Sequence, residues 1–174
     1  QFLVLDQSAL IPACNTLGYG FYSYDTRHIS QWDMYLDDMP LSLLSSTIDD
    51  GYAGSFLYTN PQTDTLPQQK VTILREVVLG DALYERITFE NFHHKPVGFV
   101  FKLRFQSDLA DMFEVRGLNR PQRGDRMMPV ASDDGSSLYL GYKGLDVALL
   151  ETQIEFHQTH PDTIAYCFRF LPNN

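Results

Sequence analysis

The best candidate for a catalytic or metal-binding site is a set of three carboxylates spaced three residues apart, Asp108, Asp111 and Glu114. A helix through them would place the three side chains near one another. Converging carboxylates could bind a hard cation, and a pair of them could supply the acid and base that cleave a glycosidic bond. The alternative is a capped turn followed by ordinary ion pairs, with Arg116 close by. No calcium-loop glycine pattern accompanies the acids, which favours the structural interpretation.

A second candidate group is Tyr24-Asp25-Thr26-Arg27, which follows a glycine-rich turn at 18–20 and precedes a strand-like stretch. A carboxylate and a guanidinium at such a junction offer paired, directional hydrogen bonds to sugar hydroxyls. Asp25 and Arg27 could instead pair with each other and fix the loop. The tetrapeptide alone leaves both interpretations open and favours the structural one.

Histidine and cysteine do not indicate a metal or redox site. His93-His94 and the spaced pair His157 and His160 lie in predicted turns, and neither pair has a carboxylate placed to orient a metal-bound imidazole. Cys14 and Cys167 stand far apart, outside any zinc-binding spacing, and are expected to be free thiols. No phosphate-binding, dinucleotide or nucleophile-elbow motif occurs, so no metal and no cofactor are expected.

The charge balance narrows the range of partners. The 13 basic and 22 acidic residues give a net charge of −9, and an acidic protein repels both the phosphates of nucleic acids and anionic lipid surfaces. Neutral sugars and protein surfaces remain candidates. Four of the basic residues lie between Arg116 and Arg126, where they could clamp an anion, dock on an acidic partner or be solvated.

Alternation of apolar and polar residues with a period of two dominates the chain. The clearest case is 97–105, where apolar residues occupy every second position, typical of a half-buried strand. Further strands are predicted at 2–5, 28–36, 41–48, 52–58, 71–79, 83–92, 137–142, 147–156 and 164–171. About ten strands joined by tight turns predict an all-β fold, a large antiparallel two-sheet sandwich.

Two stretches depart from this pattern. Residues 107–112 predict a single helical turn capped by Asp108. Residues 118–135 form a loop rich in Pro, Gly and Asp that carries three of the clustered arginines. The sequence shows no internal repeat, linker or low-complexity tract, so residues 1–174 are predicted to form one domain.

The hairpin of 71–79 and 83–89 places two charges on an apolar face. A three-residue turn at 80–82 would put Val77 opposite Glu85 and make Arg75 its diagonal neighbour. Since an unpaired charge on an apolar face is costly, we predict an Arg75–Glu85 salt bridge, at least partly buried. A two-residue turn would instead place Arg75 opposite Arg86.

Three of these stretches occur together, in the same order, in one known family. Residues 21–32, FYSYDTRHISQW, resemble the "GLFxxDTRxLSxW" opening of the N-terminal domain of bacterial glycogen-debranching (amylo-α-1,6-glucosidase-type) enzymes. Residues 75–88 are similar to that family's "RER…GDGLYERLTL" hairpin, and residues 108–117 to its "DFADLFEVRG" segment. The sequence departs at Ser23-Tyr24, where the family has a basic residue before the Asp, and at Ala82, where it has a glycine.

The resemblance implies a β-supersandwich that precedes an (α/α)6 barrel, with the catalytic carboxylates on the barrel. The boundary would fall at 171–174, so the barrel is expected downstream of this chain. We therefore expect a non-catalytic, cytoplasmic accessory domain whose partners are the catalytic domain of the same polypeptide and α-glucan, and which helps to shape the glucan site. The candidate substrate-binding or interdomain residues are Tyr24, Asp25, Arg27, Glu114 and Arg116.

Two other functions stay open. A free-standing carbohydrate-binding module would expose a row of aromatic rings in a groove, whereas a large apolar patch on one edge would favour docking. A mutarotase-like enzyme would need a His and a Glu over a sugar ring. Glu114 and Glu151 are available, but no histidine other than His28 is predicted to lie in a strand. The chain begins at Gln1 without a basic n-region, so no signal peptide is expected.

Overall fold

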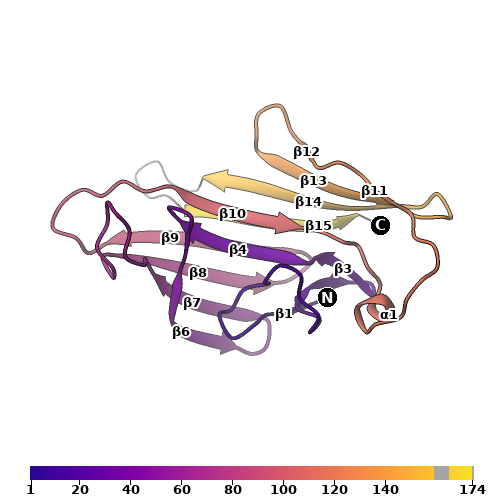
Figure 1. Cartoon of the computed structure of the whole chain (residues 1–174), viewed down its shortest axis with the longest axis horizontal. Coiled ribbons are helices and arrows are strands. Elements are labelled where there is room, and N and C mark those ends of the chain that lie inside the picture. Colours follow the sequence, from indigo (N-terminus) through magenta and orange to yellow (C-terminus); the bar gives the residue numbers. More distant parts are fainter. Residues whose placement is uncertain (159–164, 174) are drawn as a thin grey trace.

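Strands make up most of the structure, a computed structural model that describes residues 1–158 and 165–173 (Figure 1). In chain order, the elements are β1 (Phe2–Val4), β2 (Gly20–Ser23), β3 (Thr26–Ile29), β4 (Gln31–Leu36), β5 (Met39–Pro40), β6 (Ser42–Asp49), β7 (Ala53–Thr59), β8 (Val71–Leu79), β9 (Leu83–Asn91), β10 (Phe101–Gln106), α1 (Met112–Val115), β11 (Asp125–Arg126), β12 (Val130–Ala131), β13 (Ser137–Lys143), β14 (Leu149–Gln158) and β15 (Ala165–Asn173). The all-β fold class predicted from the alternation is confirmed.

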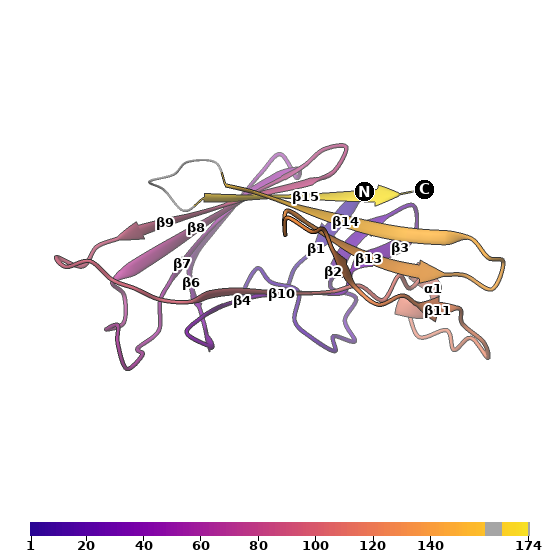
Figure 2. The ribbon, with the colours of Figure 1, turned by 90° about the horizontal axis from the view of Figure 1, so that it is seen from above.

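The strands form one large antiparallel sheet and two small ones. The large sheet has the order β11-β13-β14-β15-β9-β8-β7-β6, and β12 also pairs with β13. The small sheets have the orders β1-β2-β3 and β10-β4-β5. Seen from above, β4 and β10 run in a layer below the long strands of the large sheet (Figure 2). The arrangement is a sandwich in which one layer is much wider than the other.

Two strand predictions needed correction, and β2 was not predicted. The strand expected at 97–105 begins at Phe101, because Phe101 pairs with Leu36, the last residue of β4. Val100 bonds Asp37, where a positive φ already turns the chain out of β4. The strand expected at 28–36 is divided into β3 and β4. Alternation does not indicate β2, because all four of its residues are buried.

The core lies between the two layers. On β4, Trp32, Met34 and Leu36 are almost fully buried. They belong to one apolar cluster with residues of the large sheet, which include Phe56, Tyr58, Ile73, Val77, Leu83 and Ile87. Burying side chains of this size contributes about 1.5–3 kcal/mol each. This cluster fixes β4 and the adjoining β3 against the large sheet, and β3 carries part of the candidate site.

Arg75 and Glu85 lie inside this core. The β8–β9 register is the predicted one, with Leu79 opposite Leu83 and Val77 opposite Glu85. Arg75 donates to Glu85 from Nε at 3.0 Å and from Nη2 at 2.5 Å, and to the Ala9 carbonyl from Nη1 at 2.5 Å. Its guanidinium carbon lies 3.6 Å from the centre of the Trp32 ring. The two side chains are 0% and 1% exposed, so the charge is neutralised entirely within the protein.

A buried histidine couples β3 to the large sheet. His28 Nδ1 lies 2.9 Å from Thr152 Oγ1 on β14, and both residues are buried. Burial lowers the pKa of His28 from 6.5 to about 4, because the charged ring would lose its hydration. His28 is therefore neutral in the folded protein at neutral pH.

This burial predicts acid sensitivity. Between pH 6.5 and about 4 the unfolded chain binds a proton at His28 that the folded chain does not, so stability falls as the pH is lowered through that window. The full shift corresponds to about 3 kcal/mol. Denaturant melts across this range should show a flatter pH slope for His28→Gln than for the parent. The exposed His94→Gln is the control, and equal slopes for both variants would contradict the prediction.

Candidate functional site

The DTR stretch forms the tip of the β2–β3 hairpin. Ser23 pairs with Thr26, which leaves Tyr24 and Asp25 as a two-residue turn with φ of 46° and 62°. Turns of this kind normally use Asn-Gly, because two positive φ values are strained for other residues. Tyr24 is 78% exposed and the Asp25 side chain is also exposed. The sequence thus holds an aromatic ring and a carboxylate at a strained, exposed tip.

The segment before α1 holds this tip in place. The amide of Met112 donates to the Asp25 carbonyl at 2.9 Å, and the amide of Arg27 donates to the Ala110 carbonyl at 2.8 Å. Thr26 and Asp111 form an isolated antiparallel bridge. Residues distant in the sequence therefore lie side by side.

Arg27 takes Asp108 as its ion-pair partner. Nε donates to Asp108 Oδ1 at 3.1 Å, and Nη2 bonds Asp108 Oδ2. Nη1 reaches the Tyr19 carbonyl at 3.4 Å. Arg27 is 8% exposed, so its role here is to hold the hairpin, and the Asp25–Arg27 pair considered from the sequence is replaced by a long-range pair.

Helix α1 begins three residues later than predicted. Asp111, and not Asp108, is its N-cap: Oδ1 accepts from the amides of Phe113 at 2.8 Å and Glu114 at 2.9 Å. Glu114 Oε2 in turn accepts from the Asp111 amide at 3.1 Å, which completes a capping box. The prediction of Asp108 as the cap was wrong because Arg27 engages that carboxylate.

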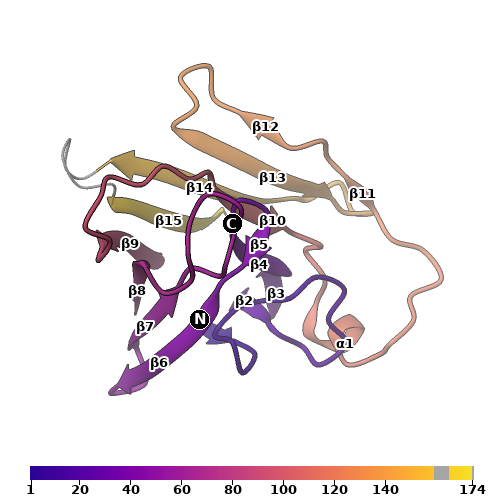
Figure 3. The same ribbon diagram turned by 60° about the vertical axis from the view of Figure 1, so that its left-hand side comes forward.

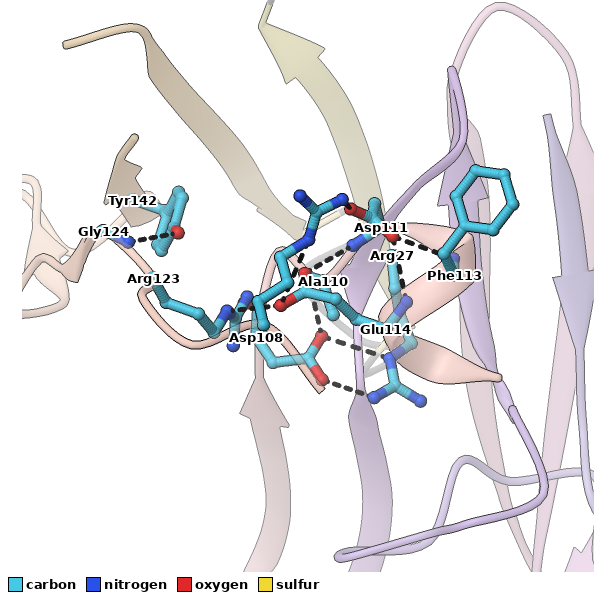
Figure 4. A network of polar contacts seen from close by, with 10 residues as sticks. Arg27, Asp108, Ala110, Asp111, Phe113, Glu114, Arg123, Gly124 and Tyr142 are labelled. Atoms are coloured by element: carbon cyan, nitrogen blue, oxygen red, sulfur yellow. Dashed lines mark hydrogen bonds and ion pairs between the residues drawn. The ribbon is translucent and has the colours of Figure 1, made fainter. Parts of the chain in front are cut away.

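The arginine loop folds back onto these carboxylates (Figure 4). Arg120 pairs with Asp111, and Arg123 pairs with Glu114 at 2.8 Å. Although burial opposes it, the Glu114 amide and the Arg120 guanidinium hold the pKa of Asp111 below its usual range. With every acid engaged, the geometry matches the ion-pair interpretation, and in the described residues no group of three His, Cys, Asp or Glu could hold a metal ion.

Tyr142 and Gly124 close the loop on β13, and no pattern in the sequence indicated this role for either residue. The Tyr142 hydroxyl accepts from the Gly124 amide at 2.7 Å, and the Arg123 guanidinium lies 5.4 Å from the Tyr142 ring centre. A side chain at Gly124 would meet the Lys143 carbonyl oxygen at 1.9 Å. This position therefore requires glycine because of the close backbone approach.

Two pockets flank α1. One, of about 390 Å³, lies among Glu114, Arg120, Arg123 and Tyr142. The other, of about 320 Å³, is lined mainly by apolar residues of β1, the 16–18 turn and α1, with Arg116 at its margin. In the part of the chain that the structure describes, Arg116 has no carboxylate partner. Its guanidinium is thus free to meet an external acidic group.

The two histidine pairs considered for metal binding lie elsewhere. His93 and His94 are 3.1 Å apart at Nδ1, in the loop after β9. His157 lies 3.6 Å from Glu155, whereas His160 falls outside the described residues. Cys14 is an exposed free thiol, and the side chain of Cys167 is likewise outside the description. No helix in the described residues is long and apolar enough to cross a membrane.

Fold and site together define an all-β antiparallel sandwich domain with a network of ion pairs around one hairpin and one short helix. The chain belongs to the family of N-terminal domains of (some) glycogen debranching enzymes, whose sequence model matches residues 1–171. The family resemblance inferred from the three motifs is thereby confirmed. No curated protein and no solved structure matched the chain.

Proposed function

We propose that this chain is the non-catalytic accessory domain of a cytoplasmic glycogen-debranching-type glycoside hydrolase. It docks on the catalytic domain of the same polypeptide and helps to shape the α-glucan site. The family match to residues 1–171 supports the parent class. The surface formed by the 24–25 turn, α1, the 118–124 loop and the 144–148 turn, here called the α1 end, supports the docking.

Large apolar side chains project from the α1 end. Those more than half exposed are Tyr24, Phe113, Leu118, Leu145 and Val147, and the exposed Leu17 and Leu149 adjoin this surface. Val147 also has a φ of 60°, a strained value for a β-branched residue. Exposed apolar groups gathered on one surface mark interaction sites, and strained turns hold their side chains in fixed directions. This concentration is the observation that carries the proposal.

The course of the chain and its net charge agree with docking through the α1 end. Asn173, at the end of β15, pairs with Glu151 near the start of β14, and the C-terminal end lies on the same side as α1 (Figure 1). Residues that follow would start beside the α1 end. The free guanidinium of Arg116 offers a positive contact from a chain of net charge −9, which suits an acidic partner surface.

The site residues have different parts in this proposal. Tyr24 and Asp25 are exposed and could contact glucan at the entrance of the catalytic site. Arg27 is a positioning residue, since it is buried against Asp108. Glu114 fixes the arginine loop through Arg123, and Arg116 contacts the partner domain.

Charge reversal at Arg116 tests the docking in the intact polypeptide. Arg116→Glu should lower activity on branched α-glucan roughly tenfold and speed hydrogen exchange at the 24–25 and 144–148 turns, because like charges then face each other. Arg86→Glu is the matched control, since Arg86 has a side chain 58% exposed on the outer face of β9. Arg116→Glu that behaves like the control would contradict the proposal.

Activity assays on the purified chain alone test the non-catalytic assignment. It should give no turnover of maltooligosaccharides or branched glucan and no acceleration of glucose mutarotation, since its carboxylates at the α1 end are engaged by arginines. Turnover above the blank that one point mutation abolishes would refute the non-catalytic assignment.

A further inference from the structure

Strand β6 is an open edge of the large sheet. It pairs with β7 along one side, and among the described residues no backbone hydrogen bond reaches its other side. Figure 3 places β6 on the side of the molecule opposite α1. The proposed docking surface at the α1 end therefore leaves this edge uncovered.

The composition of this edge is unusual for an uncovered strand. Residues 39–48 contain no charge, and seven of the eight residues of β6 are exposed. Leu44 is 52% exposed and Ile48 is 69% exposed. Natural sheets protect open edges with lysine, proline, bulges or a covering segment. The β6 strand has a bulge between Leu43 and Ser45 and one charge, Asp49, at its end, which leaves 45–48 regular, uncharged and able to pair.

The side chains of 45–49 are compatible with antiparallel self-pairing. Ser46 and Ile48 stand opposite buried residues of β7, Phe56 and Gly54, so they face the core side of the sheet. With Thr47 opposite Thr47 of a second copy, Ser46 meets Ile48, and Ser45 meets Asp49. Each pair then shares a face, as an antiparallel ladder requires, and the two Asp49 carboxylates lie at opposite ends.

We propose that two copies of this chain associate through their β6 edges about a two-fold axis at Thr47. The contact joins two large sheets into one continuous sheet and satisfies the free backbone groups of both edges. An isologous contact of this kind closes on itself and stops at a dimer. The second copy is favoured over a segment of the catalytic domain because the edge lies away from the α1 end.

Sedimentation equilibrium of the purified chain, from micromolar to millimolar concentration, tests the dimer. Thr47→Lys should raise the dimer dissociation constant roughly tenfold or more, because it places two lysines opposite each other at the axis. Thr65→Lys, in an exposed loop, makes the same change in net charge and should leave the constant unchanged. Circular dichroism melts check that each variant is folded.

Mixing two variants tests the register. Thr47→Asp alone should also weaken association, while an equimolar mixture of Thr47→Lys and Thr47→Asp should restore it as a heterodimer. A chain that stays monomeric up to millimolar concentration overturns the proposal and leaves a segment of another domain as the occupant of the edge. Dimers unaffected by Thr47→Lys, or a mixture that fails to associate, overturn the two-fold contact at Thr47.

Discussion

Replacing Glu85 by glutamine is expected to lower the free energy of unfolding by roughly 3–5 kcal/mol. The change leaves Arg75 with a charge inside the core, where its side chain is 0% exposed and stacks on Trp32. No water reaches the guanidinium to replace the lost carboxylate. Urea unfolding at neutral pH, followed by tryptophan fluorescence, measures the effect, since Trp32 is the one tryptophan and lies beside the pair.

The same hairpin supplies a matched control. Glu76 and Arg86 form an exposed pair at 3.9 Å on the opposite face, with side chains 42% and 58% exposed. Glu76→Gln should change stability by less than about 0.5 kcal/mol, as exposed pairs usually do. If Glu85→Gln unfolded at the same urea concentration as Glu76→Gln, the buried pair would not be essential to the fold.

Asp108→Asn is expected to cost roughly 2–3 kcal/mol and to release the β2–β3 tip. The effect is smaller than at Glu85 because the Arg27 and Asp108 side chains are 10% and 15% exposed. Without the carboxylate, Arg27 no longer ties β3 to the segment before α1. The amides of Arg27 and Met112, which bond across this junction, should exchange with solvent faster than in the parent.

Asp25→Asn distinguishes the Arg27–Asp108 pair from the Asp25–Arg27 pair, which the sequence left open. Asp25 lies two residues from Arg27, but its side chain is exposed. Its substitution should leave both the stability and the exchange of the Arg27 amide within error of the parent. If Asp25→Asn lowered the stability more than Asp108→Asn, the assignment of Asp108 as the partner of Arg27 would be wrong.

Local alternation was sufficient to predict most strands and the Arg75–Glu85 register. In β8 and β9 one face is mostly buried and the other is half-buried or exposed, so a slip of one residue would bury Glu76 and Arg86, and the pattern specifies the pairing. The same logic fails for β2, where both faces are covered, and for 97–100, where the partner strand has already ended at Leu36. Those features depend on tertiary neighbours that a single segment does not encode.

The candidate site was predictable in its residues but not in its pairings. The sequence indicated Arg27, Asp108, Asp111, Glu114 and the arginine cluster as relevant. Which arginine meets which acid depends on how the 118–124 loop turns back, and that turn depends on the close approach of Gly124 to Lys143. Contacts between residues 81 positions apart, such as Arg27 and Asp108, follow from the packing of two layers.

The position of β15 has a consequence for how the domain is made. β15 is the last described strand in the sequence, yet it lies between β14 and β9 and joins two groups of strands, β6 to β9 and β11 to β14, into one sheet. During synthesis each group can form its hairpins early, but the sheet cannot be completed until residues 165–173 have left the ribosome. Pairing across such long sequence separations is slow. Until β15 inserts, the nascent domain exposes the unpaired inner edges of β14 and β9. The risk of aggregation is therefore greatest in this period.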